Sequence, residues 1–405
     1  MSYRSLLAFI VLSILIFSIN SCSKKEENKT ITFWHFWSEP YQKKALQVVI
    51  DDFEKETGLK VKSTELSWND GKTKLMAAFN SGTSPDVLEL GSDWVAQFSS
   101  SGVLQEINKD SSEIDKFIPF STEPCFWDNK IYALPWFVDT RTFFVNNSIL
   151  NENDQSIPKS WEEVLEISKV INGKNGKYAF GSNGPDKNRL YKKAITFLWS
   201  SGGDLINNNQ VKFNTPENAY AMKMYADLSE YGIIEKQRNL DEFFVKGDLA
   251  FNISGGWLLE KIKNENPELD FSVIPIPGMN GREGVSFAGG EYLSISSSSD
   301  NQNNALKFIK YLTSGENTIK FCKQVIEAGF PADKNYYNDE YYKSKQNRMV
   351  FSKQLENAKM TPVSPNWFEI QDLLERAFEE VIYKEDEISN VLEKTQKSLE
   401  DVLSD

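Results

Sequence analysis

Histidine is almost absent from this chain of 405 residues, which contains only His35. A Ser-His-Asp or Cys-His nucleophile system requires a histidine base, and His35 ends a predicted strand with no nucleophile motif beside it. Zinc chemistry of the HExxH type requires two histidines and is therefore excluded. The histidine content therefore disfavours enzymes with a histidine-activated nucleophile and excludes zinc enzymes of the HExxH type.

Cysteine and glycine are also placed unfavourably for cofactor chemistry. Cys125 and Cys322 stand far apart and in no metal-ligand spacing. They could pair in an oxidising compartment, but two free buried thiols fit the sequence at least as well. No two glycines are separated by one residue, as a dinucleotide fingerprint requires, and Leu66 replaces the first glycine of a phosphate loop at Gly71-Lys72-Thr73. We expect no metal and no cofactor.

Positive charge is scarce, because 45 Lys and Arg face 58 Asp and Glu, which leaves a net charge of −13. An acidic chain is a poor partner for nucleic acid.

The first 21 residues contain one charged side chain, Arg4, which is followed by an apolar run from Leu6 to Ile19. This order is typical of a secretory signal peptide, and the run is shorter than the ~20 apolar residues of a spanning helix.

The end of this segment, Ile19-Asn20-Ser21-Cys22, resembles a bacterial lipobox, in which the cysteine becomes the lipidated N-terminus. Residues 1–21 are therefore predicted to be a signal peptide. Residues 22–29 are polar and charged and are predicted to form a solvated tether. We expect an extracytoplasmic lipoprotein, in the periplasm or at the cell surface, that contacts the membrane through its lipid alone.

From Thr30 onward, short apolar strands alternate with amphipathic helices, which is typical of an α/β fold with mainly parallel sheets. Strands are predicted over 30–34 and 59–65. The helix between them begins near Pro40 and stops at Gly58, and its apolar face would contain Ala45, Val48, Val49 and Phe53. The chain is too long for one ordinary domain, so two lobes are expected.

Local signals predict further elements. Asp128-Asn129 predicts a hairpin, and Thr140 to Asn146 reads as a long strand that leaves the first lobe. Ser160-Trp161-Glu162-Glu163 is a capping box that opens a helix to Ile171. Asp93 lies where a helix begins, so it suits a helix cap and a ligand contact equally.

Tryptophan is the most informative residue type, because many of the ten lie where strands end or helices begin, beside groups that can hydrogen-bond. A sugar ring has an apolar face and a polar rim, which aromatic faces beside charged and amide groups satisfy. Core packing is the alternative for each tryptophan, and we favour it for Trp34. The residues predicted to contact a ligand on this reasoning are His35, Trp37, Glu39, Asp93, Trp94, Trp136, Asp139, Arg141, Trp199, Trp257 and Trp367. Asp139 and Arg141 could instead be a structural ion pair.

Six segments in order resemble the extracellular solute-binding proteins of bacterial sugar-uptake ABC transporters, which include maltodextrin-binding proteins. These segments are Ile31-Thr32-Phe33-Trp34-His35, residues 81–87, Ala133-Leu134-Pro135-Trp136 with Asp139-Thr140-Arg141, Ile253-Ser254-Gly255-Gly256-Trp257, Phe287-Ala288-Gly289-Gly290-Glu291 and Ser364-Pro365-Asn366-Trp367. Leu90 departs from the aromatic that some maltodextrin binders carry there, which weakens the case for a long glucan.

The resemblance implies a type II periplasmic binding protein-like fold, with two α/β lobes, hinge strands and a ligand cleft. We expect residues 30–138 plus 287–332 in the N-terminal lobe and 139–286 plus 333–405 in the C-terminal lobe. The resemblance implies Trp257 and Trp367 as second-lobe stacking residues. It adds Glu291 as a hinge-side contact after Gly289 and Gly290.

The leading hypothesis is a monomeric binding protein that closes on a mono- or oligosaccharide and delivers it to ABC permease subunits, without catalysis. A glycoside hydrolase is the first alternative, with paired carboxylates such as Glu65, Asp93, Asp139 or Glu291. A surface glycan-binding lipoprotein that works without a permease is the second.

Overall fold

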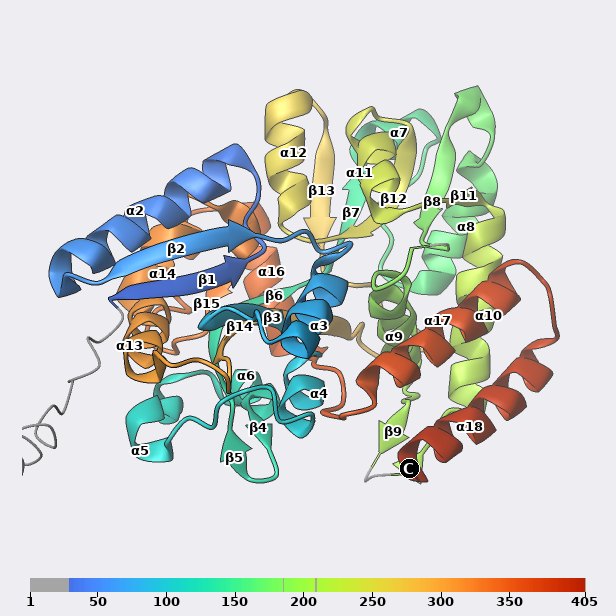
Figure 1. The fold of residues 1–405 in the computed structure, drawn as a ribbon. Helices are drawn as coiled ribbons and strands as arrows, with labels where there is room; N and C mark the ends of the chain where they lie inside the picture. The colour runs from blue at the N-terminus through green and yellow to red at the C-terminus, as the bar shows by residue number, and fades with distance from the viewer. Residues whose placement is uncertain (1–28, 185, 208–209, 405) are drawn as a thin grey trace, which may run out of the picture.

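A computed structural model describes residues 29–184, 186–207 and 210–404, which form two α/β lobes side by side (Figure 1). The predicted signal peptide, Cys22 and nearly all of the predicted tether lie outside the described residues. Among those described, no helix combines the length and apolar character needed to cross a membrane.

The first lobe is built on a seven-stranded sheet of order β15-β6-β14-β3-β1-β2, in which β16 also pairs with β14. Its strands are β1 (Thr30–His35), β2 (Lys60–Glu65), β3 (Val87–Gly91), β6 (Ala133–Thr140), β14 (Ser286–Ile295), β15 (Phe330–Pro331) and β16 (Ala358–Lys359). The β1–β2 and β1–β3 pairs are parallel, but β14 runs antiparallel to both β3 and β6. The prediction of a mainly parallel sheet is wrong for this lobe, because β14 returns from the second lobe in the opposite direction.

Helices cover both faces of this sheet (Figure 1). They are α2 (Pro40–Thr57), α3 (Gly71–Ser81), α4 (Val95–Ser100), α5 (Lys109–Ser112), α6 (Pro119–Thr122), α13 (Gln302–Leu312), α14 (Gly315–Cys322), α15 (Glu340–Lys343) and α16 (Gln346–Glu356), with the 3₁₀ turns η1 (Ile114–Lys116), η2 (Glu123–Cys125) and η4 (Ile326–Ala328). As predicted, α2 ends at Gly58, which has a φ of 71° and donates its N–H to Glu54 O. Val48 is 46% exposed, so its predicted burial is wrong: the buried stripe passes through Val49 and Ile50 instead.

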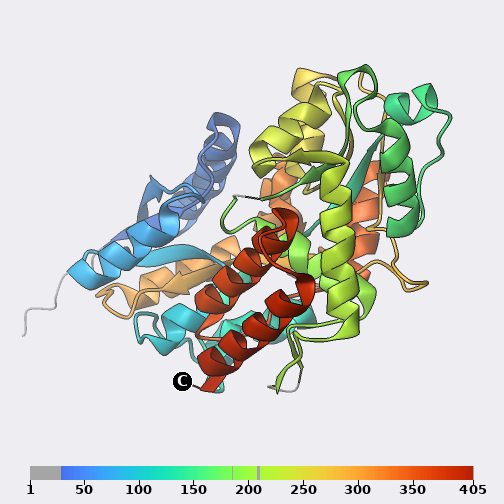
Figure 2. The ribbon, with the colours of Figure 1, turned by 90° about the vertical axis from the view of Figure 1, so that its right-hand side faces the viewer.

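The second lobe contains a five-stranded sheet of order β11-β8-β12-β7-β13. Its strands are β7 (Thr142–Asn146), β8 (Tyr178–Ser182), β11 (Gly232–Ile234), β12 (Leu249–Ser254) and β13 (Phe271–Ile274). The helices of this lobe are α7 (Asn147–Glu152), α8 (Trp161–Ile171), α9 (Leu190–Ser201), α10 (Pro216–Glu230), α11 (Gln237–Val245), α12 (Trp257–Glu265), α17 (Trp367–Ile382) and α18 (Ile388–Ser404), with the 3₁₀ turn η3 (Lys174–Gly176). Figure 2 shows α17 and α18 packed as a pair on the outside.

Two predicted local features are confirmed. The hairpin of β4 (Phe126–Trp127) and β5 (Lys130–Ile131) turns at Asp128 and Asn129, both of which have positive φ. Ser160 caps α8, since its hydroxyl accepts the N–H of Glu163 at 3.2 Å. Strands β9 (Ile206–Asn207) and β10 (Gln210–Val211) pair antiparallel in a separate two-stranded sheet.

The chain passes between the sheets at Arg141, which separates β6 from β7, and again through residues 275–285, which separate β13 from β14. Helix α16 packs against strands of both sheets. One apolar cluster accordingly runs from the first lobe onto the α11, α12 and α16 side of the second sheet. A second cluster fills the opposite face of that sheet under α8, α9, α10 and α17.

The two remaining cysteines are buried and free, so the disulfide alternative for Cys125 and Cys322 is not realised. Burial raises the pKa of the Cys322 thiol to about 12, which makes it a poor nucleophile.

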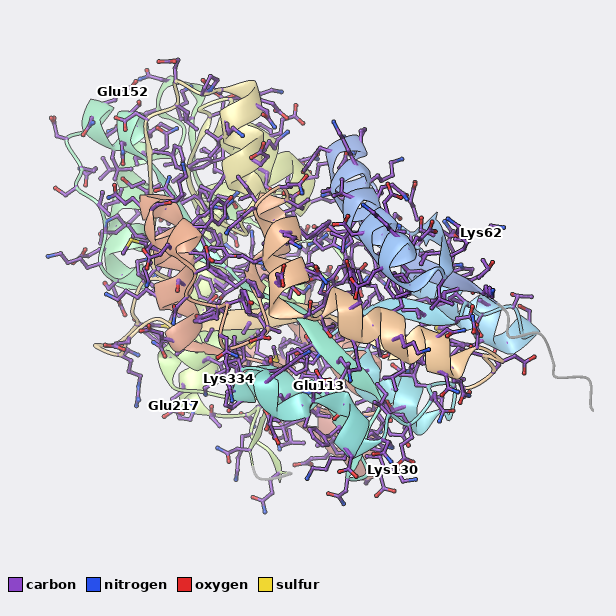
Figure 3. The ribbon with its side chains drawn as sticks, turned by 90° about the vertical axis from the view of Figure 1, so that its left-hand side faces the viewer. Lys62, Glu113, Lys130, Glu152, Glu217 and Lys334 are labelled. Atoms are coloured by element: carbon purple, nitrogen blue, oxygen red, sulfur yellow. The ribbon has the colours of Figure 1, made fainter. Side chains whose placement is uncertain are left out.

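Charged side chains cover the outer surface of the first lobe (Figure 3), where Lys130 pairs with Glu106 and Glu113 pairs with Lys310. Exposed pairs of this kind each contribute little to stability.

Candidate ligand-binding cleft

A cleft of about 640 Å³ lies between the lobes. Its first-lobe wall consists of segments 36–39, 68–69 and 91–94, which follow the carboxyl ends of β1, β2 and β3. Its second-lobe wall includes segments 186–192 and 236–241, which follow β8 and β11. Ligands of open α/β sheets bind at the carboxyl ends of their strands, so the topology brings the ligand-binding loops of both lobes to one place.

The cleft brings together most of the residues predicted to contact a ligand. Those that line it are Trp37, Glu39, Asp93, Trp94, Asp139, Arg141, Trp257, Gly289, Gly290 and Glu291. They come from the ends of strands in both lobes and from the crossing strands β6 and β14.

Four predicted contact residues lie outside the lining of the cleft. His35 is 2% exposed, and its Nδ1 accepts the N–H of Trp37. Trp136 packs between Phe rings in the first-lobe core, and Trp199 donates its Nε1–H to Asp204. Trp367 is fully buried beside Tyr191. A polar neighbour in sequence does not keep an aromatic face free, because neighbouring elements pack over it. Trp34 packs against the first-lobe core as expected and is half-buried.

Sequence reasoning missed the aromatic pair on the first-lobe wall. Phe36 and Trp68 stack with ring centroids 4.0 Å apart and planes 16° from parallel, and Trp94 meets both rings edge-on. Trp68 is half-buried, whereas Trp94 is only 4% exposed. The signal was present, since Trp68 follows the end of β2 as Trp37 follows the end of β1.

Trp257 is held rigidly on the opposite wall. Its Nε1–H donates to Asp241 Oδ2 at 2.7 Å, and the Arg141 guanidinium lies 4.7 Å from its ring centroid. A Cβ on Gly255 would come within 2.0 Å of the indole, so only glycine allows the ring to fold back here. Asp241 is buried and also accepts from Asn252. The half-buried Trp257 therefore faces the cleft in a fixed orientation.

The floor of the cleft is formed where the chain crosses between lobes. Asp139 and Arg141 form the ion pair that the sequence allowed, and both side chains line the cleft. Arg141 also lies 5.5 Å from the ring centroid of Phe287. A Cβ on Gly290 would be 2.2 Å from Phe137 O, which explains glycine where β14 presses against β6.

Asp93 connects the two lobes. The Tyr191 hydroxyl of α9 donates to Asp93 Oδ2 at 2.7 Å. Helix α4 begins after Trp94 without a side-chain cap, so the capping alternative for Asp93 is wrong. A bond between residues of opposite walls exists only while the lobes are close together.

Two carboxyl groups have raised pKa values on the first-lobe side, Glu89 behind the cleft and Glu291 in its lining. Glu89 on β3 is fully buried, and its Oε2 accepts the N–H of Phe36 at 2.9 Å. Burial raises the pKa of Glu89 to about 8. Burial, followed by the Asp139 charge, also raises the pKa of Glu291 well above its usual range. Glu89 can therefore carry a proton near neutral pH and act as a hydrogen-bond donor. Sequence reasoning missed Glu89, although a lone carboxylate inside an apolar strand is a visible signal.

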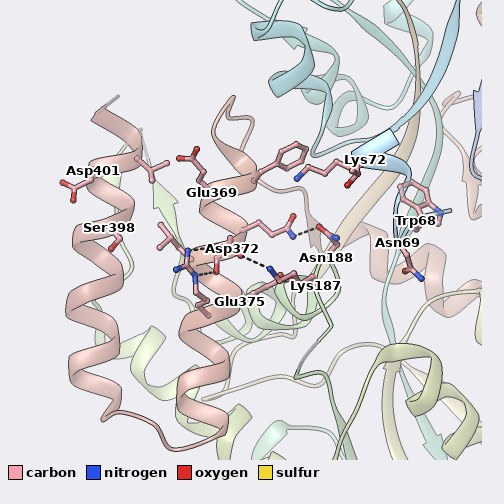
Figure 4. A pocket seen from close by; sticks show the side chains of 16 residues that line it. Trp68, Asn69, Lys72, Lys187, Asn188, Glu369, Asp372, Glu375, Ser398 and Asp401 are labelled. Carbon is pink, nitrogen blue, oxygen red and sulfur yellow. Dashed lines mark hydrogen bonds and ion pairs between the residues drawn. The ribbon is translucent and has the colours of Figure 1, made fainter. Parts of the chain in front are cut away.

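A second cavity of about 600 Å³ continues the cleft and shares with it Trp68, Asn69, Lys187 and Asn188. Figure 4 shows Trp68 and Lys72 on one side of this cavity and the α17–α18 pair on the other. Gln371 Nε2 donates to Asn188 Oδ1 at 2.8 Å across its floor. Within the described ranges, no group of three or more Asp, Glu, His or Cys side chains is arranged to hold a metal ion.

Two α/β lobes, a strand crossing and a cleft lined from both sides define a binding protein of the type II periplasmic fold. The chain belongs to the family of bacterial extracellular solute-binding proteins, which is matched over residues 49–350. This family consists of binding proteins, and it places the chain outside the cytoplasm.

Individual relatives have low sequence identity to this chain, but the similarity covers most of both chains. The galactooligosaccharide-binding protein of Bacillus subtilis is 24% identical over 386 residues, which cover 89% of this chain and 88% of the relative. The GacH receptor of Streptomyces glaucescens, whose structures include complexes with acarbose, has a TM-score of 0.84 at 22% identity and covers 93% and 98% of the two chains. A solute-binding protein of Thermotoga lettingae bound to α-D-tagatose has a TM-score of 0.83 at 23% identity, with 92% and 99% covered.

Glu89→Gln should alter the pH dependence of stability. The folded protein retains a proton that the unfolded chain releases between the ordinary pKa of 4.5 and the folded value of about 8, so the Glu89 contribution to the free energy of unfolding falls as pH rises through this window. The amide does not titrate, so thermal unfolding should show little advantage of the variant at pH 5 and a clear advantage at pH 8. Glu106→Gln on the exposed surface is the control. An advantage that is constant with pH would contradict the burial of a proton at Glu89.

Proposed function

We propose that this protein binds a mono- or oligosaccharide in the interlobe cleft as a monomer and delivers it to the permease of an ABC importer. The observation that carries the proposal is the placement of two half-buried tryptophans, Trp68 and Trp257, on opposite walls of one cleft. Carboxylate, guanidinium and amide groups lie between them. The sugars named for the Bacillus and Streptomyces proteins support the same ligand class.

The free energy available from stacking a sugar on these tryptophans is sufficient for micromolar affinity. Burying ~150 Å² of apolar sugar face is worth about 4 kcal/mol. Micromolar affinity requires about −8 kcal/mol, so two stacked faces and a small surplus from hydrogen bonds cover the cost of ordering the ligand. The polar groups then select the sugar, because an unmade hydrogen bond in a buried site costs ~1–3 kcal/mol.

Binding and closure are coupled because the contact residues belong to both lobes. A ligand held by both walls binds only the closed arrangement strongly, so it shifts the population toward that arrangement. The Tyr191–Asp93 hydrogen bond has the same property. No catalytic step is required.

The glycoside hydrolase alternative has less support. Glu65, one of its candidate carboxylates, is exposed on β2, pairs with Lys43 at 3.3 Å and does not line the cleft. Asp139 is engaged by Arg141, and Asp93 by Tyr191. A surface glycan-binding role without a permease uses the same cleft and differs only in the partner.

Trp257→Ala should weaken sugar binding at least tenfold, because it removes one stacking face worth about 2 kcal/mol or more. Isothermal titration with a sugar that raises the thermal unfolding temperature of the wild type would measure the change. Trp34→Ala, outside the cleft, should leave affinity within about twofold. Equal losses in both variants would mean that Trp257 acts on stability and not on the ligand.

Ligand-induced closure should be visible by small-angle scattering. Addition of a binding sugar should decrease the radius of gyration, since the contacts on both lobes form together only in the closed state. Asp93→Asn keeps the shape of this side chain and weakens the Tyr191 contact, so the unliganded variant should be at least as open as the wild type. A radius that no bound sugar changes would contradict closure.

Lipidation of Cys22 would hold the binding protein near its permease at a high local concentration. Expression in a bacterium with lipoprotein processing should yield a membrane-associated protein with a diacylglyceryl-modified N-terminal cysteine in mass spectrometry. Cys22→Ser should release a protein with unchanged sugar affinity. An unmodified N-terminus in the wild type would remove the tethering proposal and leave the binding proposal intact.

A further inference from the structure

We propose that the natural ligand is an anionic carbohydrate, a uronate or a sulfate ester, whose charged group is bound by Arg189 and Lys192 on the second-lobe wall. This inference rests on the proposed function and specifies its ligand class. It follows from two cations that line the cleft and form no ion pair among the described residues.

Arg189 and Lys192 both line the cleft at the start of α9. Among the described residues, no carboxylate pairs with either side chain. The Arg189 guanidinium lies 5.9 Å from the Trp257 ring centroid, and Lys192 Nζ lies 5.2 Å from that of Phe287. Asp186 and Asp241 attract Arg189, and Asp93 and Asp139 attract Lys192, without closing an ion pair. Both cations can therefore accept a close ion pair from the anionic group of a ligand.

The carboxylates around the cleft are already engaged within the protein. Asp186 accepts the N–H of Gln237 at 2.7 Å, and the others are held by the phenol, guanidinium and indole partners described above. The engaged carboxylates are Asp93, Asp139, Asp186 and Asp241, together with Glu39, which accepts a backbone N–H of the first turn of α2, and Glu327, which accepts from Tyr41 and Gln42. Glu291 has a buried Oε2 without a hydrogen-bond partner among the described residues, so this oxygen is available to a ligand group.

The backbone of the second-lobe wall also contributes partial positive charge, through the N-termini of three helices. Helices α9, α11 and α12 begin just after the carboxyl ends of β8, β11 and β12, so their N-termini lie at the cleft. The first turns of α9 and α11 contain no acidic residue. The positive ends of these helix dipoles add to the side-chain charges. Lys236 and Arg238 at the start of α11 add two further cations, on a chain whose net charge is −13.

An anion would also relieve repulsion between the cations themselves. Burial, then the Arg141 charge, lowers the pKa of Lys192 to about 8, and the same two causes lower the pKa of Arg189. Asp139 already compensates Arg141. A neutral sugar would occupy the same space but leave Arg189 and Lys192 desolvated and unpaired. A carboxylate or sulfate can accept charge-assisted hydrogen bonds from both.

The test is calorimetric titration of the full mature chain with uronate di- and trisaccharides, each compared with its carboxyl-reduced counterpart of identical linkage. Galacturonate, glucuronate and mannuronate series form one arm, and sulfated galactose oligosaccharides form the other. At least one anionic ligand should bind ten times more tightly than its neutral counterpart, and its affinity should fall with added salt. The arm that contains it identifies the anionic group.

Two variants locate the effect. Arg189→Gln and Lys192→Met should each weaken the anionic ligand at least tenfold and change the neutral counterpart less than threefold. Lys263→Met is the matched control, because Lys263 on α12 pairs with Glu260 at 3.1 Å and does not line the cleft. It should leave both affinities unchanged.

Neutral ligands that bind as tightly as their anionic counterparts would overturn the inference and leave sugar binding standing. Equal loss of both ligands in the Arg189 and Lys192 variants would overturn it as well, since these side chains would then contact neutral hydroxyls. If no carbohydrate of either class binds, the proposed function itself fails.

Discussion

Strands β6 and β14 pair antiparallel from Ala133 opposite Ser294 to Thr140 opposite Ala288, and the cleft depends on this ladder. Both strands belong to the first-lobe sheet, and both continue directly into a crossing to the second lobe. The pairing of β6 with β14 places Asp139, Gly289 and Gly290 on the floor of the cleft. The close approach of Gly290 to Phe137 O allows the ladder to continue to the point where the lobes separate.

Electrostatics divide the two walls of the cleft. The first-lobe side contributes carboxyl groups, and burial raises the pKa of both Glu89 and Glu291. The second-lobe side contributes cations, the carboxylates Asp186 and Asp241, and helix N-termini. A cleft of this kind offers a ligand both hydrogen-bond donors and acceptors. The Asp93–Tyr191 hydrogen bond is one direct contact between the two sides, and the edge-on contact of Trp94 with Phe368 of α17 is another.

Rigid presentation of the aromatic side chains is achieved through buried polar groups. Asp241, 3% exposed, receives hydrogen bonds from four side chains and thereby orients Trp257. On the other wall, Phe36 supports Trp68 by stacking. Because these supports are already formed, little conformational entropy remains to be lost when a ligand binds.

Local sequence determined the elements whose causes are local. Gly58 ends α2, Asp128-Asn129 forms a hairpin and Ser160 caps α8, because each depends only on residues a few positions away. The order of family segments also indicated the two-lobed fold. Tertiary structure alone decided which aromatic faces stay free: Trp136 and Trp367 are covered by side chains distant in sequence, while Trp68 is left half-buried. It also decided that Arg189 and Lys192 have no carboxylate partner among the described residues, because the position of a counter-charge depends on how whole lobes pack and not on sequence spacing.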